Sequence, residues 1–186
     1  AAEGGVTPAD LVVAALRATR WGHPVTAEGS AALSRDSQGV CAVASADAVS
    51  RELPEPSVGE TLVVLAQGRD PGNVGTIIRT ADAFGAVGVI TVSGTVEATS
   101  PKVVRASAGS VFHIPVCVVS SFEEAHALIH RRSAALLGTS GGVGSLDLSQ
   151  MLAQGGSGRS RLSQSHAWVF GNEAKGLSGA EMRLCD

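Results

Sequence analysis

The chain has 186 residues, of which 44% are hydrophobic but only 3% aromatic, so we expect a core of aliphatic side chains, enough for one domain and part of another. Its formal net charge of −3, from 14 basic and 17 acidic side chains, excludes wholesale coating of a polyanion but leaves room for a local basic patch. No apolar run approaches the roughly 18 to 20 residues that span a bilayer, and the first residues lack the order of a signal peptide, so neither a membrane partner nor export is expected.

The first fifty residues are predicted to form a small α/β piece. Apolar residues recur at helical spacing from Pro8 to Thr19, and the run Gly39–Ala44 is typical of a short buried strand. These two elements are too few to fold well alone. Residues 51–60 combine prolines with mixed charges, a composition typical of a linker, so we place a domain boundary there.

From Thr61 onward, predicted strands and helices alternate, which favours an α/β fold with a mostly parallel sheet covered on both faces. The expected strands are 62–66, 88–92, 114–119, 134–139 and 167–170. The expected helices are 74–84, 101–108 and 122–132. The glycine- and serine-rich stretch 154–165 is expected to be a loop rather than a site.

An amide and a guanidinium stand on the first of these helices, which is otherwise apolar. Asn73 follows the turn Asp70-Pro71-Gly72 at the end of a predicted strand, and Arg79 lies further along the helix. Open α/β proteins bind ligands at the carboxyl edge of the sheet, where this segment is expected. From spacing alone, a helix cap and a solvated arginine explain the pattern equally simply.

Two further glycine-rich segments, Gly138–Gly142 and Gly171–Leu177, follow predicted strands at the same edge. Glycines there let the backbone approach a ligand closely, as a nucleotide-like cofactor requires. Neither segment is a G-x-G-x-x-G motif or a phosphate loop, so a standard dinucleotide fold or P-loop enzyme is not expected. A hydrolase triad is not expected either.

A basic pair lies on the second predicted helix. Lys102 and Arg105 are three residues apart and share a helical face, so together with Arg79 they could contact phosphates. A solvated helix face is the alternative interpretation of the same pair.

The cysteines and histidines give no metal-binding pattern. Cys41, Cys117 and Cys185 are scattered, so neither a zinc site nor a disulfide framework is predicted, and a reducing cytoplasm fits best. His126 and His130 are four residues apart, but without the glutamate of an H-E-x-x-H motif we expect exposed helix residues and no metal.

Three motifs taken together resemble those of the SpoU family, also called TrmH, of RNA ribose 2′-O-methyltransferases. They are Asn73-x-Gly75-x-x-x-Arg79-Thr80, Arg105-Ala106-Ser107-x-Gly109-Ser110 and Phe170-Gly171-Asn172-Glu173-x-x-Gly176-Leu177. The resemblance covers residues 61–186, and Gln38–Val43 looks like the tail of the L30e-like RNA-binding domain of many members. The expected organisation is a partial L30e-like domain at 1–50, a linker at 51–60 and a methyltransferase domain at 61–186.

The resemblance implies a SPOUT fold, an α/β sheet whose C-terminal segment forms a trefoil knot around S-adenosylmethionine. It also implies a homodimer whose RNA site is built from both subunits. The catalytic positions carried over are Arg79, Asn73 and Glu173. The positions expected to bind the cofactor are Gly138, Thr139, Gly141, Gly171, Asn172, Gly176 and Leu177. Those expected to bind RNA are Arg79, Lys102, Arg105 and Ser107.

The chemistry of ribose methylation gives these residue types a role. A ribose hydroxyl is a poor nucleophile at neutral pH and must lose its proton as it attacks the methyl carbon. We expect Arg79 to clamp a phosphate and to stabilise the developing alkoxide by its charge. Asn73 would orient Arg79 or the ribose, and Glu173 would fix the site across the motifs.

The family's third motif, an Ile-Pro strand followed by a Ser-Leu-Asn loop, would begin just after Asp186. We therefore expect the 186 residues to be part of a longer protein, with the knot segment incomplete within them. A non-catalytic RNA-binding or assembly protein on the same scaffold is the main alternative to an enzyme. A base methyltransferase of the wider SPOUT group fits the motifs less well. Ribosomal RNA and transfer RNA both remain open as substrates.

Overall fold

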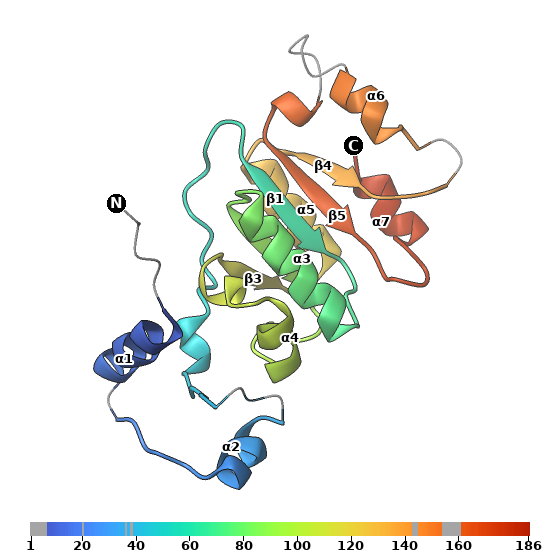
Figure 1. Cartoon of the computed structure of the whole chain (residues 1–186). Coiled ribbons are helices and arrows are strands. Elements are labelled where there is room, and N and C mark those ends of the chain that lie inside the picture. The colour runs from blue at the N-terminus through green and yellow to red at the C-terminus, as the bar shows by residue number, and fades with distance from the viewer. Residues whose placement is uncertain (1–6, 20, 36, 38, 143–144, 154–160) are drawn as a thin grey trace. The chain divides into compact units, whose positions relative to one another are not determined.

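The chain divides into two compact units, Ala1–Ser45 and Ala46–Asp186. Figure 1 presents a computed structural model, which describes residues 7–19, 21–35, 37, 39–142, 145–153 and 161–186. Within these residues no helix combines the length and apolar character that a bilayer crossing requires.

The first unit contains two helices, α1 (Pro8–Ala18) and α2 (Ala27–Leu33). A capping box starts α1, because the hydroxyl of Thr7 accepts from the backbone N–H of Asp10 while the Asp10 carboxylate accepts from that of Thr7. The helix predicted from Pro8 is thus confirmed. The strand predicted at Gly39–Ala44 is wrong: these residues are exposed and irregular, and no described strand of this unit lies beside them to complete a ladder. Gln38, the first residue of the expected L30e-like tail, lies outside the described residues.

The second unit is built on a five-stranded sheet in which all neighbouring strands run parallel. The strands are β1 (Thr61–Leu65), β2 (Gly88–Val92), β3 (Val116–Val119), β4 (Ala135–Gly138) and β5 (His166–Phe170), in the spatial order β3-β2-β1-β5-β4. The parallel α/β sheet expected from the sequence is confirmed, with each strand within about two residues of its predicted bounds.

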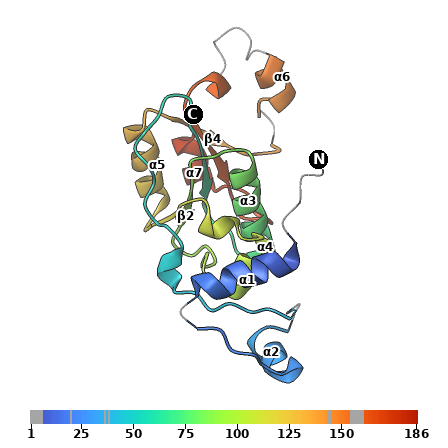
Figure 2. The same ribbon diagram turned by 60° about the vertical axis from the view of Figure 1, so that its left-hand side comes forward.

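Helices cover both faces of this sheet (Figures 1 and 2). The described helices of this unit are α3 (Pro71–Ala83), α4 (Pro101–Ala106), α5 (Phe122–Arg131), α6 (Leu148–Ala153) and α7 (Gly179–Leu184), with short 3-10 turns η1 (Ala46–Ala48), η2 (Ser110–Phe112) and η4 (Arg161–Ser163). Of these, α6 lies away from the sheet (Figure 1). The sequence predictions did not include α6 and α7. Part of the expected loop 154–165 lies outside the described residues, and η4 occupies its later part.

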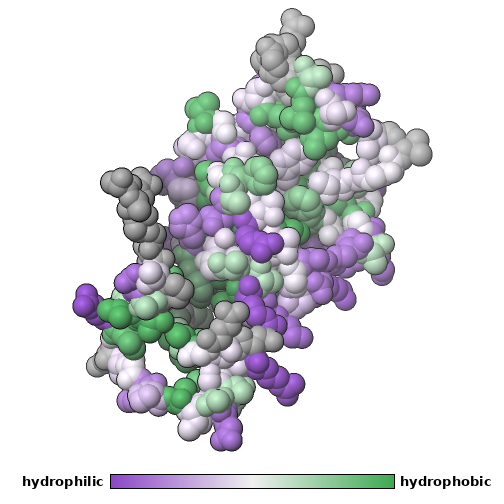
Figure 3. All heavy atoms as spheres, in the orientation of Figure 1, coloured by the Kyte–Doolittle hydropathy of each residue, from purple (hydrophilic) through white to green (hydrophobic). Residues whose placement is uncertain are grey.

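The alternation of side chains along β1 separates two apolar layers. Leu62 and Val64 face a layer shared with α5, whereas Val63 and Leu65 face a layer shared with α3 and α4. Both layers are almost entirely aliphatic, as the composition predicts. Large apolar side chains are also exposed, and Figure 3 shows them gathered over α1 and over α6.

Residues 51–60, whose composition is typical of a linker, are held firmly against the sheet. The carboxylate of Glu60 accepts from Nε and Nη2 of Arg132 at 2.6 and 2.8 Å, and Nη1 of Arg132 donates to the carbonyl of Pro54 at 2.9 Å. Burial raises the pKa of Glu60, but the hydrogen bonds from Arg132 and Ser57 outweigh it and leave the pKa below its usual value. Just upstream, Val49 is only 4% exposed. The segment therefore behaves as part of the second unit.

Candidate functional site

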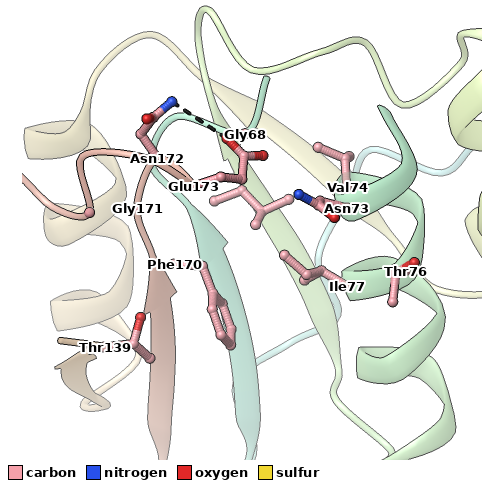
Figure 4. Close-up of a pocket in the computed structure, with 12 residues that line it drawn as sticks. Gly68, Asn73, Val74, Thr76, Ile77, Thr139, Phe170, Gly171, Asn172 and Glu173 are labelled. Atoms are coloured by element: carbon pink, nitrogen blue, oxygen red, sulfur yellow. Dashed lines mark hydrogen bonds between the residues drawn. The ribbon is translucent and has the colours of Figure 1, made fainter. Parts of the chain in front are cut away.

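A crevice opens where the order of the strands reverses. The chain leaves β1 toward α3 on one face of the sheet and leaves β5 toward α7 on the other, although β1 and β5 are paired neighbours with Leu65 opposite Phe170. Such a switch point is the usual ligand site of an open α/β sheet. A cavity of about 300 Å³ lies there, and Figure 4 shows the side chains that line it.

The first wall of this cavity is the start of α3. The carboxylate of Asp70 caps the helix by accepting from the backbone N–H of Asn73 at 2.8 Å, and Pro71 occupies the first turn. The cap is thus Asp70, which leaves the amide of Asn73 available to line the cavity together with Thr76 and Ile77.

The second wall is the loop that follows β5. The backbone of Asn172 and that of Gly176 exchange two hydrogen bonds, of 3.0 and 2.7 Å, which close the loop on itself. The side-chain oxygen of Asn172 accepts from the backbone N–H groups of Ala174 and Lys175 inside the loop. Gly176 has φ of +67°, and a Cβ on Gly171 would lie 2.3 Å from the carbonyl carbon of Gly176. Both glycines are therefore required by the loop geometry.

Glu173 connects the two walls. One carboxylate oxygen accepts from the backbone N–H of Asp70 at 3.3 Å, and the other lies 3.5 Å from the amide nitrogen of Asn172. The pKa of Glu173 is lowered, most strongly by its own backbone N–H and further by the backbone of Asp70 and the side chain of Asn73. Figure 4 shows Glu173 and Asn73 turned toward each other from opposite walls. The structure thus brings two of the three predicted catalytic positions together around an anionic carboxylate.

The third predicted catalytic residue lies apart from this pair. Arg79 follows Asn73 by six positions on α3, which places it about 120° around the helix axis from Asn73. Its side chain is exposed, does not line the cavity and has no hydrogen-bond or ion-pair partner among the described residues. Its cationic group is therefore available to a ligand that extends beyond the cavity.

The residues of the second motif, which begins with Arg105, pack against those of the first motif on α3. A Cβ on Gly75 would lie 2.5 Å from Cβ of Ala106 and 2.8 Å from the backbone nitrogen of Ser107, so α3 and α4 are in contact at this glycine. Ser107 is fully buried, and its hydroxyl donates to the carbonyl of Val104. In this conformation Ser107 is not accessible to RNA, whereas Lys102 and Arg105 are exposed.

Of the residues expected to bind the cofactor, some line the cavity and others do not. Thr139, Gly171, Asn172 and Gly176 line the cavity. Gly138 instead faces the interior, where a Cβ would lie 3.0 Å from Sγ of Cys185 and 3.2 Å from Cδ1 of Leu177. Leu177 packs against the apolar core, and a Cβ on Gly141 would meet no atom within 4 Å.

Sequence reasoning missed several cavity residues that carry no polar chemistry. Leu65 and Phe170 form its floor as the last residues of two paired strands, and Gly68 lies in the turn that leaves β1. The sequence could have indicated such positions, because the last apolar residue of a parallel strand lies beside the crevice at the carboxyl edge of the sheet. The described residues contain no cluster of three or more side chains suited to a metal ion.

Comparison with known proteins agrees with this geometry. The sequence model of the SpoU rRNA Methylase family matches residues 60–186. The chain belongs to this family. The resemblance seen in the three motifs is therefore confirmed.

Relatives and solved structures of the family extend the comparison. A 23S rRNA (uridine(2479)-2'-O)-methyltransferase of Streptomyces viridochromogenes is 37% identical over 62% of this chain and 39% of its own length. The 23S rRNA (guanosine-2'-O-)-methyltransferase RlmB of Bordetella pertussis is 30% identical over 91% of this chain and 68% of its own. The crystal structure of the SpoU methyltransferase AviRb from Streptomyces viridochromogenes in complex with AdoMet superposes with a TM-score of 0.61 at 30% identity, covering 76% of this chain and 52% of that one. The chain thus spans from about two fifths to two thirds of these proteins.

Proposed function

We propose that this protein transfers a methyl group from S-adenosylmethionine to a ribose 2′-hydroxyl of ribosomal RNA. The observation that carries the proposal is the meeting of Asn73 and Glu173 over a cavity at the switch point of the sheet. Relatives named as 23S rRNA 2′-O-methyltransferases support the same reaction and favour ribosomal over transfer RNA.

The residues of the cavity suit this cofactor. Its walls are largely apolar, from Leu65, Ile77 and Phe170, with a few polar groups at one end, which is the usual character of a small-molecule site. Thr139, Asn172 and the glycines of the loop would hold the cofactor, and the anionic Glu173 complements a cationic sulfonium. When bound, S-adenosylmethionine supplies an electrophilic methyl group.

The protein's own residues would prepare the ribose. Arg79 projects a fixed positive charge from the helix that carries Asn73, and it clamps a phosphate of the RNA so that the 2′-oxygen faces the cavity. The same charge stabilises the alkoxide that develops as the hydroxyl loses its proton. Asn73 orients the ribose, and Glu173 holds the turn before α3 and the loop after β5 in one arrangement.

The wider organisation belongs to the same proposal. A SPOUT trefoil knot and an L30e-like domain at residues 1–50 are part of this proposal. Asp186 lies beside β4, where its backbone and carboxylate exchange hydrogen bonds with the backbone of Leu136. The similarity to RlmB extends over 91% of the chain and so into the first unit. Unpaired thiols at all three cysteines favour the reducing cytoplasm. A homodimer would cover exposed apolar side chains such as Phe84, which is 86% exposed.

The reaction is tested with the full-length protein and labelled S-adenosylmethionine on ribosomal RNA from cells that lack the gene. We expect 2′-O-methylation at a defined nucleotide, which Arg79→Ala reduces by about a hundredfold or more while cofactor affinity, measured by calorimetry, stays within a few-fold. Arg131→Ala, which removes an exposed arginine from α5, is the matched control and should retain activity. Turnover by Arg79→Ala equal to wild type would refute the role of Arg79. Cofactor binding or methylation absent from the wild-type protein would favour a non-catalytic RNA-binding protein instead.

A further inference from the structure

A second cavity lies at the same edge of the sheet, on the opposite face from α3. It has a volume of about 440 Å³ and is bordered by the ends of β1 and β2 and the beginnings of α5 and α7. Figures 1 and 2 show α3 and α5 on opposite sides of the sheet, so the two cavities open on either side of its carboxyl edge. Nothing in the proposed reaction uses this second space.

One short turn separates the two cavities. Gly68 lines the first cavity, while its neighbours Gln67 and Arg69 line the second. Alternate residues of an extended turn point to opposite sides, and this turn leaves β1 with that alternation. The two cavities thus flank residues 67–69, and neighbouring nucleotides of one RNA strand lying across this edge would enter both.

The second cavity carries separated charges of opposite sign. The side chain of Arg69 is exposed and has no hydrogen-bond or ion-pair partner among the described residues. Glu123, in the first turn of α5, is exposed as well, and no ion pair joins it to Arg69 in the described part of the chain. Its own backbone N–H and the hydroxyl of Ser121 lower the pKa of Glu123, so it is anionic at neutral pH.

Gln67, Ser178 and Glu181 are joined by hydrogen bonds and hold the shape of the cavity. Glu181 is 9% exposed, accepts from the backbone N–H of Ser178 at 2.6 Å and lies 3.4 Å from the amide nitrogen of Gln67. Phe122 is 5% exposed and closes the apolar base. Arg69 and Glu123 are thus the charged groups left to meet a ligand.

We propose that this cavity receives a nucleotide adjacent to the methylated one, with Arg69 on its phosphate and Glu123 accepting from an exocyclic amino group of its base. The inference rests on the proposed function and adds to it a residue that selects the neighbouring base. Cytosine, adenine and guanine carry such an amino group, whereas uracil does not, and a carboxylate reads an amino group as a hydrogen-bond acceptor. The space fits one nucleotide, since sites for small ligands begin at about 300 Å³.

The test uses the full-length protein loaded with S-adenosylmethionine and fluorescein-labelled RNA nonamers. The probes are oligouridine and its versions with one central cytidine, adenosine or guanosine, and the readout is anisotropy across a salt series. We expect wild type to bind the substituted probes about tenfold more tightly than oligouridine. Glu123→Ala, which removes the acceptor, should remove most of this difference and leave oligouridine binding unchanged. Arg69→Ala should weaken binding of every probe and lower the salt slope by about one.

Arg131→Ala serves as the matched control, because it removes an exposed arginine from α5 outside both cavities. Equal affinity of wild type for all probes, or an unchanged preference in Glu123→Ala, would overturn the inference. The methylation assay on ribosomal RNA separates this result from a failure of the proposed function. If the protein methylates ribosomal RNA but shows no base preference, only the second nucleotide site is contradicted. If it shows the base preference but does not methylate, the proposed enzyme activity is contradicted and the second site stands.

Discussion

The two walls of the candidate site are built by different means. The turn before α3 is fixed by side chains, because the carboxylate of Asp70 caps the helix and Pro71 begins it. The loop after β5 is fixed by its backbone, because two glycines allow the chain to close on itself. A wall made by a side chain tolerates an isosteric replacement, whereas a wall made by close backbone contact does not tolerate one added carbon.

The largest effect should come from Gly171→Ala. The added Cβ would lie 2.3 Å from the carbonyl carbon of Gly176, so the loop must shift. A shift of about 1 Å at a reacting centre costs about a hundredfold in rate, and we expect that loss in methylation assays together with weaker cofactor binding by calorimetry. Gly179→Ala is the control, since its Cβ would meet only Nη1 of Arg183, at an ordinary contact distance of 3.6 Å. Wild-type activity in Gly171→Ala would mean that the loop does not hold the cofactor.

A smaller effect should come from Asp70→Ala. Loss of the cap should lower the free energy of unfolding by about 1 kcal/mol, measured by urea denaturation. Asp70→Asn keeps an oxygen that accepts from the backbone N–H of Asn73, so it should retain most of the stability. If both variants unfold alike, the carboxylate charge rather than the cap hydrogen bond holds this wall.

The smallest effect should appear in the pH dependence of Glu173, which joins the walls. Its pKa is lower in the folded protein than the ordinary value, so its contribution to stability is complete above the ordinary pKa and is lost as the pH falls through the lowered one. The urea midpoint of wild type should therefore fall in acid more than that of Glu173→Gln. Identical acid profiles would contradict the link between the walls. The side chain is exposed, so the difference should be small.

The sheet and the meeting of Asn73 with Glu173 were predictable because both follow from local patterns. Runs of apolar residues indicate buried strands, and parallel strands bring their carboxyl ends to one edge. Helix α7 was predictable too, since Ser178 and Glu181 form a capping box that the sequence already contains. The direction in which Arg79 points relative to the cavity was harder to predict from the sequence. Helical spacing gives an angle around the helix axis but not the position of the cavity.

Distant partners account for features that local composition could not show. The run Gly39–Ala44 has the composition of a strand, but a strand also requires a neighbour to complete its hydrogen bonds, and none lies beside it in the described residues. The segment 51–60 has the composition of a linker, yet Glu60 pairs with Arg132, 72 positions later. Ser107 stands in a basic cluster, but the contact of α4 with Gly75 buries it.

The pair formed by Glu60 and Arg132 has a mechanical consequence for the site. It lies immediately before β1 and ties the chain to the end of α5, while Val49 anchors the same segment further upstream. A force applied through the N-terminal unit would reach these two anchors before it reached β1. The strand that carries the cavity floor is thus insulated from tension on the N-terminal unit.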